Sequence, residues 1–157
     1  MNKLSDNLTT NEPVELGELE DSFGFLVRMT QVRVFEAFFN GVGQHELKPG
    51  EYSVLWIISL NPNVRQGDVA RRLSIKPAHM TKVIQRLESR GFLTRHIPDN
   101  DRRSVRLKLT DEGQEFVDKY KEAYFTYYEM ENSLSSDEMA QLTKLLQKFI
   151  GLEKGQS

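Results

Sequence analysis

The stretch that decides the fold runs from residue 66 to residue 109 and reads QGDVARRLSIKPAHMTKVIQRLESRGFLTRHIPDNDRRSVRLKL. Its first half contains two short helical patterns, residues 66–73 and residues 77–90, with only a few residues between them. Pro77 suits the first turn of the second helix, and Gly91 stops that helix. This spacing predicts a helix-turn-helix.

A β-hairpin is predicted directly after the second helix. Residues 92–97 and residues 105–109 favour strands, and the polar loop between them begins at Pro98. A helix-turn-helix followed by a hairpin is a winged helix. We therefore expect a mainly α fold with a small β-hairpin wing, in which long dimerisation helices flank a winged helix-turn-helix.

Long helical patterns lie on both sides of this module. Residues 19–39 carry apolar side chains on two helical faces, and a second helix begins at Pro49. On the other side, Thr110 caps a long helix, and Ser135 forms a capping box with Glu138 at the start of the last helix. The apolar stripes of these two later helices consist of Phe116, Tyr120, Ala123, Tyr127, Met130, Leu134, Met139, Leu142, Leu146, Phe149 and Ile150.

The flanking helices have little of their own chain to cover their apolar faces. A single stripe would fit an ordinary intrachain core. Several stripes rich in aromatic residues around one small module need more partner surface than the chain supplies. Packing against a second copy provides that surface, and two-fold dimers are the commonest closed assemblies. We therefore expect a homodimer.

A chain of 157 residues is long enough for one domain and too short for two domains with a linker. We expect residues 1–17 to be a disordered leader and residues 18–157 to form one unit. Within this unit, we expect the winged lobe at about 48–109, and dimerisation helices at about 18–43 and 110–152.

The charge of the chain is unevenly distributed. Between Arg65 and Lys108 there are twelve basic and four acidic side chains, a net charge of +8. Because the whole chain carries −2, the rest carries −10. A basic middle between acidic ends favours binding to a polyanion, although charge alone also fits a solvated surface.

Composition also limits where the protein acts. The chain has no cysteine, which excludes disulfides, thiolate–metal sites and cysteine redox sensing. It has no apolar run of about 18 residues that could span a membrane, and its N-terminus has no signal-peptide pattern. We therefore expect a cytoplasmic protein that does not bind a membrane.

The motifs of the common enzyme classes are missing from the sequence. There is no glycine-rich phosphate loop, no glycine-flanked serine elbow and no cluster of histidine with carboxylates. His45, His79 and His96 lie in separate predicted elements, and no two have the single-turn spacing of a zinc pair. We expect no enzymatic activity, no cofactor and no metal site.

Double-stranded DNA is the polyanion that a helix-turn-helix fits, because its second helix enters the major groove. The apolar face of residues 77–90 packs inward. The other face is left for solvent or DNA and comprises Ala78, His79, Thr81, Lys82, Gln85 and Arg86. Lys82 and Arg86 can neutralise phosphates or donate to guanine, whereas the neutral polar side chains can form directional hydrogen bonds with bases.

The tip of the hairpin supplies a second contact. Arg102 and Arg103 can enter a narrow minor groove, which has a high negative potential. Asp99 and Asp101 would be repelled by DNA if they pointed outward. We therefore expect these two carboxylates to bind backbone amides or to orient the arginines within the turn.

Several motifs together resemble the MarR family of winged helix-turn-helix regulators, and they cover most of the chain. These motifs are residues 73–77 (LSIKP), 81–82 (TK), 86–88 (RLE), 91–93 (GFL), 99–104 (DNDRRS) and 109–113 (LTDEG). The resemblance implies a triangular dimer that represses from a pseudo-palindromic operator and releases it on binding a small molecule. It adds Lys76 to the DNA contacts and makes Arg103 the minor-groove probe. At Lys82 the family more often has arginine, which weakens the expectation of bidentate guanine recognition there.

The resemblance also implies an effector pocket between the dimer helices and the winged lobe. Its expected residues are Arg28, as the partner of a carboxylate or phosphate, and Tyr52, Trp56 and Tyr124, as aromatic walls. The hypothesis is a small aromatic or carboxylated metabolite, free or as a coenzyme A thioester. The alternative is a structural role, with Arg28 in an interhelical salt bridge and Trp56 in the core, and the sequence favours this alternative.

One competing function remains. A winged-helix fold can serve as a protein-interaction module that does not bind DNA. Such a module would not need the basic middle segment, and its binding would depend only weakly on salt.

Overall fold

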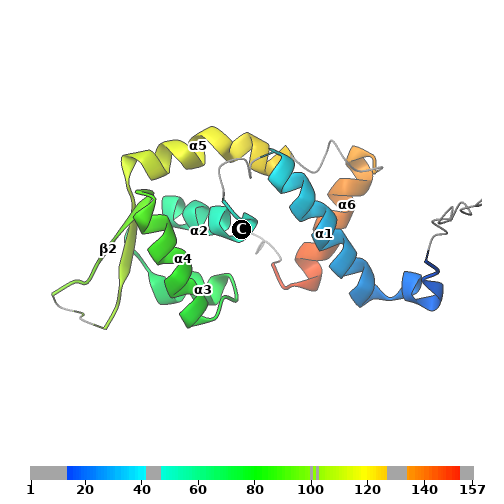
Figure 1. The fold of residues 1–157 in the computed structure, drawn as a ribbon, viewed down its shortest axis with the longest axis horizontal. Coiled ribbons are helices and arrows are strands. Elements are labelled where there is room, and N and C mark those ends of the chain that lie inside the picture. The colour runs from blue at the N-terminus through cyan, green and yellow to red at the C-terminus, as the bar shows by residue number, and fades with distance from the viewer. Residues whose placement is uncertain (1–13, 42–46, 100, 102, 127–133, 153–157) are drawn as a thin grey trace, which may run out of the picture. The chain divides into compact units, whose positions relative to one another are not determined.

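The computed structural model describes residues 14–41, 47–99, 101, 103–126 and 134–152. Their helices, drawn in Figure 1, are η1 (Gly17–Asp21, a 3-10 helix), α1 (Phe23–Gly41), α2 (Pro49–Leu60), α3 (Gln66–Arg72), α4 (Pro77–Ser89), α5 (Asp111–Thr126) and α6 (Ser136–Phe149). Their strands are β1 (Val64–Arg65), β2 (Leu93–His96) and β3 (Arg106–Leu109). The expectation of a mainly helical, winged helix-turn-helix fold is confirmed.

The chain divides into two compact units within α1. The first unit ends at Val34 and holds η1 with most of α1, and the second begins at Phe35 and holds every later element. The predicted disordered leader falls mostly on residues 1–13, which lie outside the described residues. The predicted domain boundaries stay a prediction.

The wing is a small antiparallel sheet with strand order β1-β3-β2. In β2 and β3, Leu93 pairs with Leu109 and His96 pairs with Arg106. The sequence predicted these two strands to within one residue at each end. It did not predict β1, because two residues are too few to show an alternating pattern.

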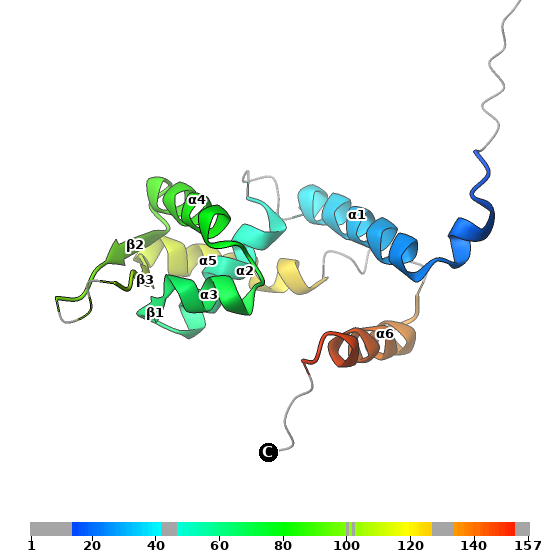
Figure 2. The ribbon, with the colours of Figure 1, turned by 90° about the horizontal axis from the view of Figure 1, so that it is seen from below.

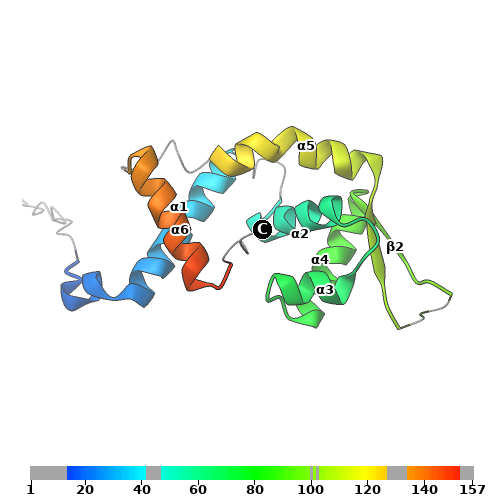
Figure 3. The same ribbon diagram turned by 180° about the vertical axis from the view of Figure 1, so that it is seen from behind.

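The core of the second unit is centred on α2. This helix lies between α5 and the helix-turn-helix (Figures 1 and 3). Its buried Leu55 and Ile58 belong to the same apolar cluster as Ile84 of α4, Leu107 of β3 and Val117 of α5. Burial of these side chains holds α4 and the wing in one compact unit.

The connection between α4 and α5 depends on two glycines. Gly91 has a φ of +79°, and the N–H groups of Gly91 and Phe92 donate to the carbonyls of Glu88 and Leu87, which ends α4 in a Schellman motif. Gly113 has no room for a side chain, because a Cβ there would lie 1.9 Å from the carbonyl oxygen of Phe92. The backbone at Phe92, just after α4, is therefore in direct contact with the start of α5.

Two predicted helix starts are confirmed. The Gly113 N–H donates to the Thr110 hydroxyl (3.0 Å), and that hydroxyl donates to the Gly91 carbonyl. At α6, Ser135 and Glu138 form the expected capping box, and the hydrogen bonds from Ser135 lower the pKa of Glu138. Tyr127, Met130 and the rest of residues 127–133, which were expected to continue α5, lie outside the described residues.

The inward face that was predicted for α6 is largely exposed in the single chain. Met139 and Leu142 are partly buried, whereas Leu146, Phe149 and Ile150 are exposed. Among the residues that the structure describes, no helix is both long and apolar enough to cross a bilayer.

Candidate nucleic-acid interface

Helix α4 has the two faces that the sequence predicted. Its apolar side chains Met80, Val83, Ile84 and Leu87 are buried. On the opposite face, the exposed residues are Ala78, His79, Lys82 and Gln85, together with Lys76 just before the helix. The β2–β3 hairpin extends from the same lobe (Figure 2). One compact unit thus presents a polar helix face and a hairpin to solvent.

Thr81 lies at the edge of this face and is partly buried. Its hydroxyl donates to the Pro77 carbonyl (3.0 Å) and accepts from the Gln66 side-chain amide (3.2 Å). Because a hydroxyl has one proton, Thr81 in this arrangement can only accept a further hydrogen bond. Thr81 therefore also links α3 to α4, which the sequence did not indicate.

Arg86 departs from the sequence prediction. It was assigned to the outward face, but it is partly buried, and its guanidinium lies 3.3 Å from the carboxylate of Glu51. Glu51 is 4% exposed. Its charge needs a partner at that depth, and Arg86 provides one. Helical periodicity could not predict this pair, because Glu51 and Arg86 lie in different helices and are 35 positions apart in the sequence.

The wing tip is stabilised by Asp101. Its carboxylate accepts from the Ser104 hydroxyl and lies 3.4 Å from the Arg65 guanidinium of β1. The pKa of Asp101 is lowered, chiefly by the Ser104 hydrogen bond and also by the Arg103 backbone N–H and by Arg65. The ionised Asp101 carboxylate therefore stabilises the folded wing at neutral pH, and this stabilisation is lost as the pH falls through the lowered pKa. The prediction that Asp101 binds a backbone amide within the turn is confirmed by the hydrogen bond from the Arg103 N–H.

Arg103 is exposed, and Arg102 lies outside the described residues. Asp99, the other predicted turn carboxylate, is exposed. Arg106 follows on β3, where it donates to the backbone carbonyl of Asn63 (3.1 Å). Arg103 is therefore exposed on the wing, whereas Arg65 contacts Asp101 and Arg106 contacts the backbone at Asn63.

The residues expected to bind an effector fall into two groups. Tyr52, Trp56 and Tyr124 form one aromatic cluster between α2 and α5, with ring centroids of Tyr52 and Tyr124 4.3 Å apart. Arg28 lies on α1 in the first unit and is exposed. Tyr52 is fully buried and its ring is part of the core, which fits the structural alternative; its place in an effector site stays a prediction.

Tyr52 is held by its hydroxyl as well as by its ring. The hydroxyl donates to the Val117 carbonyl of α5 (2.8 Å), and burial raises its pKa to about 12. The Tyr124 hydroxyl shares a hydrogen bond with Ser53 (2.8 Å). Two polar contacts thus fix α2 against α5 beside the stacked rings.

Trp56 is the more accessible part of the cluster. It is partly buried, its ring meets the exposed ring of Phe125 edge-on at 5.4 Å, and the Lys121 ammonium lies 5.4 Å from its centroid. An aromatic surface beside a cation suits a flat, negatively charged ligand.

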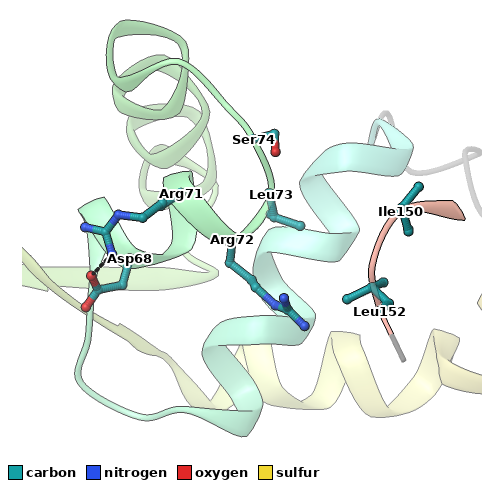
Figure 4. Close-up of a pocket in the computed structure, with 7 residues that line it drawn as sticks. All are labelled: Asp68, Arg71, Arg72, Leu73, Ser74, Ile150 and Leu152. Carbon is teal, nitrogen blue, oxygen red and sulfur yellow. Dashed lines mark hydrogen bonds and ion pairs between the residues drawn. The ribbon is translucent and has the colours of Figure 1, made fainter. Parts of the chain in front are cut away.

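A separate open cleft of about 930 Å³ lies elsewhere in the second unit (Figure 4). Its lining residues are Asp68, Arg71, Arg72, Leu73, Ser74, Ile150 and Leu152. Arg71 is paired with Asp68 (2.9 Å), and the side chain of Arg72 extends away from that pair. The residues expected to bind an effector do not line this cleft.

Replacing Tyr52 with phenylalanine is expected to lower the free energy of unfolding by about 1 kcal/mol at neutral pH, because it removes the buried hydrogen bond to Val117. Since the raised pKa favours the protonated hydroxyl in the folded state, this advantage of the wild type should shrink as the pH rises from 10 towards 12. Urea unfolding across that pH range measures both effects. Tyr124→Phe is the matched control, for which we expect a smaller loss in the free energy of unfolding. If Tyr52→Phe were as stable as the wild type, the buried hydrogen bond to Val117 would be contradicted.

Comparisons with known proteins agree with this geometry. A model of the MarR family matches residues 47–105. The uncharacterized HTH-type transcriptional regulator YkoM of Bacillus subtilis (strain 168) is 33% identical over 129 residues, which are 76% of this chain and 84% of YkoM. The chain belongs to the MarR family. It is therefore a winged helix-turn-helix transcription regulator of a DNA-binding, non-enzymatic family.

Other similar proteins include regulators whose partners are known. The homoprotocatechuate degradative operon repressor of Escherichia coli is 27% identical over 135 residues, covering 85% of this MarR-family chain and 91% of the repressor. The structure of the transcriptional repressor CouR bound to a 23-mer DNA duplex has a TM-score of 0.80 and 31% identity, covering 88% of this chain and 99% of CouR. A second structure of CouR, bound to p-coumaroyl-CoA, has a TM-score of 0.78 and 28% identity, covering 88% and 98%.

Proposed function

We propose that this chain is a homodimeric repressor that binds a pseudo-palindromic operator and leaves it when an aromatic or carboxylated metabolite binds. In each subunit, α4 enters the major groove and the wing tip enters the adjacent minor groove. The observation that carries the proposal is the pairing, on one compact unit, of the outward face of α4 with Arg103 on the exposed wing. Both lie in the segment that carries a charge of +8.

The contacts divide into two kinds. Base choice is assigned to His79, Thr81, Lys82 and Gln85, and affinity with shape reading to Lys76, Arg102 and Arg103. Ala78 allows close approach and apolar contact with a thymine methyl. Arg86, whose charge is balanced by Glu51, is proposed here to act through the position of α4.

Exposed apolar side chains support a dimer. Large hydrophobic residues are exposed on the two flanking helices, namely Phe23, Leu26, Val27, Met29, Phe35 and Phe39 of α1, and Leu145, Leu146 and Phe149 of α6. Several large apolar side chains exposed on one helix usually mark an interaction site. A second copy, bringing the same helices, is the partner that the sequence itself supplies.

The test of this function is selection of bound duplexes from a random pool, followed by affinity measurements against salt. We expect two half-sites whose centres lie about one helical turn apart. If six to ten phosphates are contacted, the affinity should fall by about 10³-fold or more between 50 and 200 mM salt. Weak salt dependence with no enriched sequence would instead favour a protein-interaction module.

The effector is proposed to be a small aromatic or carboxylated metabolite, free or as its coenzyme A thioester. Its proposed site is the accessible edge of the aromatic cluster at Trp56 and Tyr124. That Arg28 binds a carboxylate or phosphate of the ligand stays a prediction from the sequence. The CouR structure with p-coumaroyl-CoA and the repressor of homoprotocatechuate degradation support this class of ligand.

Trp56 provides a direct signal for this binding, because it is the only tryptophan of the chain. A bound aromatic ligand is expected to change the fluorescence of Trp56 and to lower the affinity of the protein for its operator. Calorimetry measures the binding of the ligand itself. Arg28→Ala should weaken carboxylated ligands more than neutral analogues if Arg28 belongs to the site. The proposal fails if no aromatic acid or thioester binds, or if binding leaves operator affinity unchanged.

A further inference from the structure

The carboxylate of Glu51 serves two elements at once. One oxygen accepts the Lys48 N–H at the start of α2 (2.9 Å), and the other lies 3.3 Å from the Arg86 guanidinium of α4. The Glu51 side chain is 5% exposed, whereas that of Arg86 is 39% exposed. A buried charge held at a fixed backbone position leaves Arg86 little freedom, because moving it away would leave the carboxylate unpaired.

The next residue along α2 holds the opposite neighbour. Tyr52 donates to the Val117 carbonyl of α5 and stacks on Tyr124 of the same helix. Two consecutive residues at the start of α2 therefore fix α4 on one side and α5 on the other. Neither contact involves the residues to which base choice is assigned.

We infer that Glu51 is a positioning residue for operator recognition, and that its pair with Arg86 sets how α4 is held relative to α5 and thereby the half-site spacing that the dimer accepts. This inference rests on the proposed function, in which α5 belongs to the dimer helices and α4 reads each half-site. Since the two copies of α4 must reach two major grooves together, a looser hold on α4 broadens the range of separations that the dimer accepts before it alters the contact with a single half-site.

Glu51→Gln is the variant that isolates this role. It keeps the size of the side chain and an oxygen for the Lys48 N–H, but it removes the charge that pairs with Arg86. Asp68→Asn is the matched control, because it removes the same charge from the same lobe. The pair of Asp68 with Arg71 is exposed and lies within α3, so it joins no two elements.

The measurement uses duplexes that carry two copies of the selected half-site, with the spacer varied by single base pairs across one helical turn. Wild type and Asp68→Asn should show the same sharp optimum. Glu51→Gln should lose about tenfold in affinity at that optimum and less than about threefold at neighbouring spacings, so that its profile is flatter. Affinity for a duplex with one half-site should stay within about twofold of wild type.

A second variant keeps the inference testable if Glu51→Gln does not fold. Arg86→Lys retains the positive charge but loses the fixed geometry of the guanidinium, so it should flatten the profile in the same direction. Urea unfolding of each variant shows whether it is folded under the conditions of the DNA-binding measurements.

The outcomes separate the inference from the function on which it rests. Spacing profiles of both variants that run parallel to wild type would overturn the positioning role. So would an Arg86→Lys variant that loses affinity equally at every spacing and on the single half-site, because Arg86 would then contact DNA directly. Wild-type protein that shows no operator and no spacing preference would instead contradict the proposed function.

Discussion

Replacing Arg103 with alanine is expected to lower affinity for the selected operator at least about tenfold. The side chain is exposed at the wing tip, while the turn beneath it is held by Asp101 through Ser104 and Arg65. A guanidinium presented on such a fixed turn gains most from the negative potential of a narrow minor groove, and the dimer loses two of them. Fluorescence anisotropy at several salt concentrations should also show a log–log salt slope that is shallower by about two.

Arg72→Ala is the control for this loss of charge. Arg72 is exposed in the same unit, but it lines the cleft beside Ile150 and Leu152 and lies outside the proposed interface (Figure 4). We expect its affinity and its salt slope to stay close to those of the wild type. Equal effects of the two substitutions would mean that only net charge matters, and an unchanged affinity of Arg103→Ala would remove the wing from the interface.

Replacing Gly113 with alanine is expected to lower the free energy of unfolding by about 2–3 kcal/mol, the upper part of the usual range for overpacking. The new Cβ would lie 1.9 Å from the carbonyl oxygen of Phe92 and 2.8 Å from its carbonyl carbon, so the start of α5 must move away from the backbone that ends α4. The hydrogen bonds of Thr110 with Gly91 and Gly113 span the same contact and would be strained by that shift. Urea unfolding followed by circular dichroism measures the loss.

Gly67→Ala is the matched control for this substitution. Gly67 is also near the start of a helix, α3, and a Cβ there would meet no atom within 4 Å. Alanine should therefore leave the protein as stable or raise its stability by up to about 1 kcal/mol, because it favours the helix. If Gly113→Ala were as stable as Gly67→Ala, the close backbone contact would not exist in solution.

The sequence predicted most of the elements that form this fold. Pro77 and Gly91 fixed the limits of α4 to within one residue of Ser89, and the pattern of Met80, Val83, Ile84 and Leu87 identified its buried face. Local rules suffice there, because a cap, a stop and a helical period all act within a few residues. The capping box at Ser135 and the Thr110 cap were predicted for the same reason.

The roles of several side chains could not be read in this way. The sequence predicted Arg86 as a basic side chain on the outward face of α4 and Tyr52 as an aromatic wall of a pocket. The structure gives Arg86 the buried carboxylate of Glu51 and places Tyr52 inside the core against Val117. Each of these contacts joins residues that are 35 or 65 positions apart, and no periodicity within one helix contains that information.

By itself, the sequence determined that the chain has a basic helix-turn-helix with a hairpin wing, because helix limits, strand alternation and charge are local properties. Only the tertiary structure decided which of the cations pair with buried groups of the scaffold. The free energy of a charged side chain depends on the partners that folding brings to it. Arg103 is exposed, whereas Arg86 pairs with the buried carboxylate of Glu51.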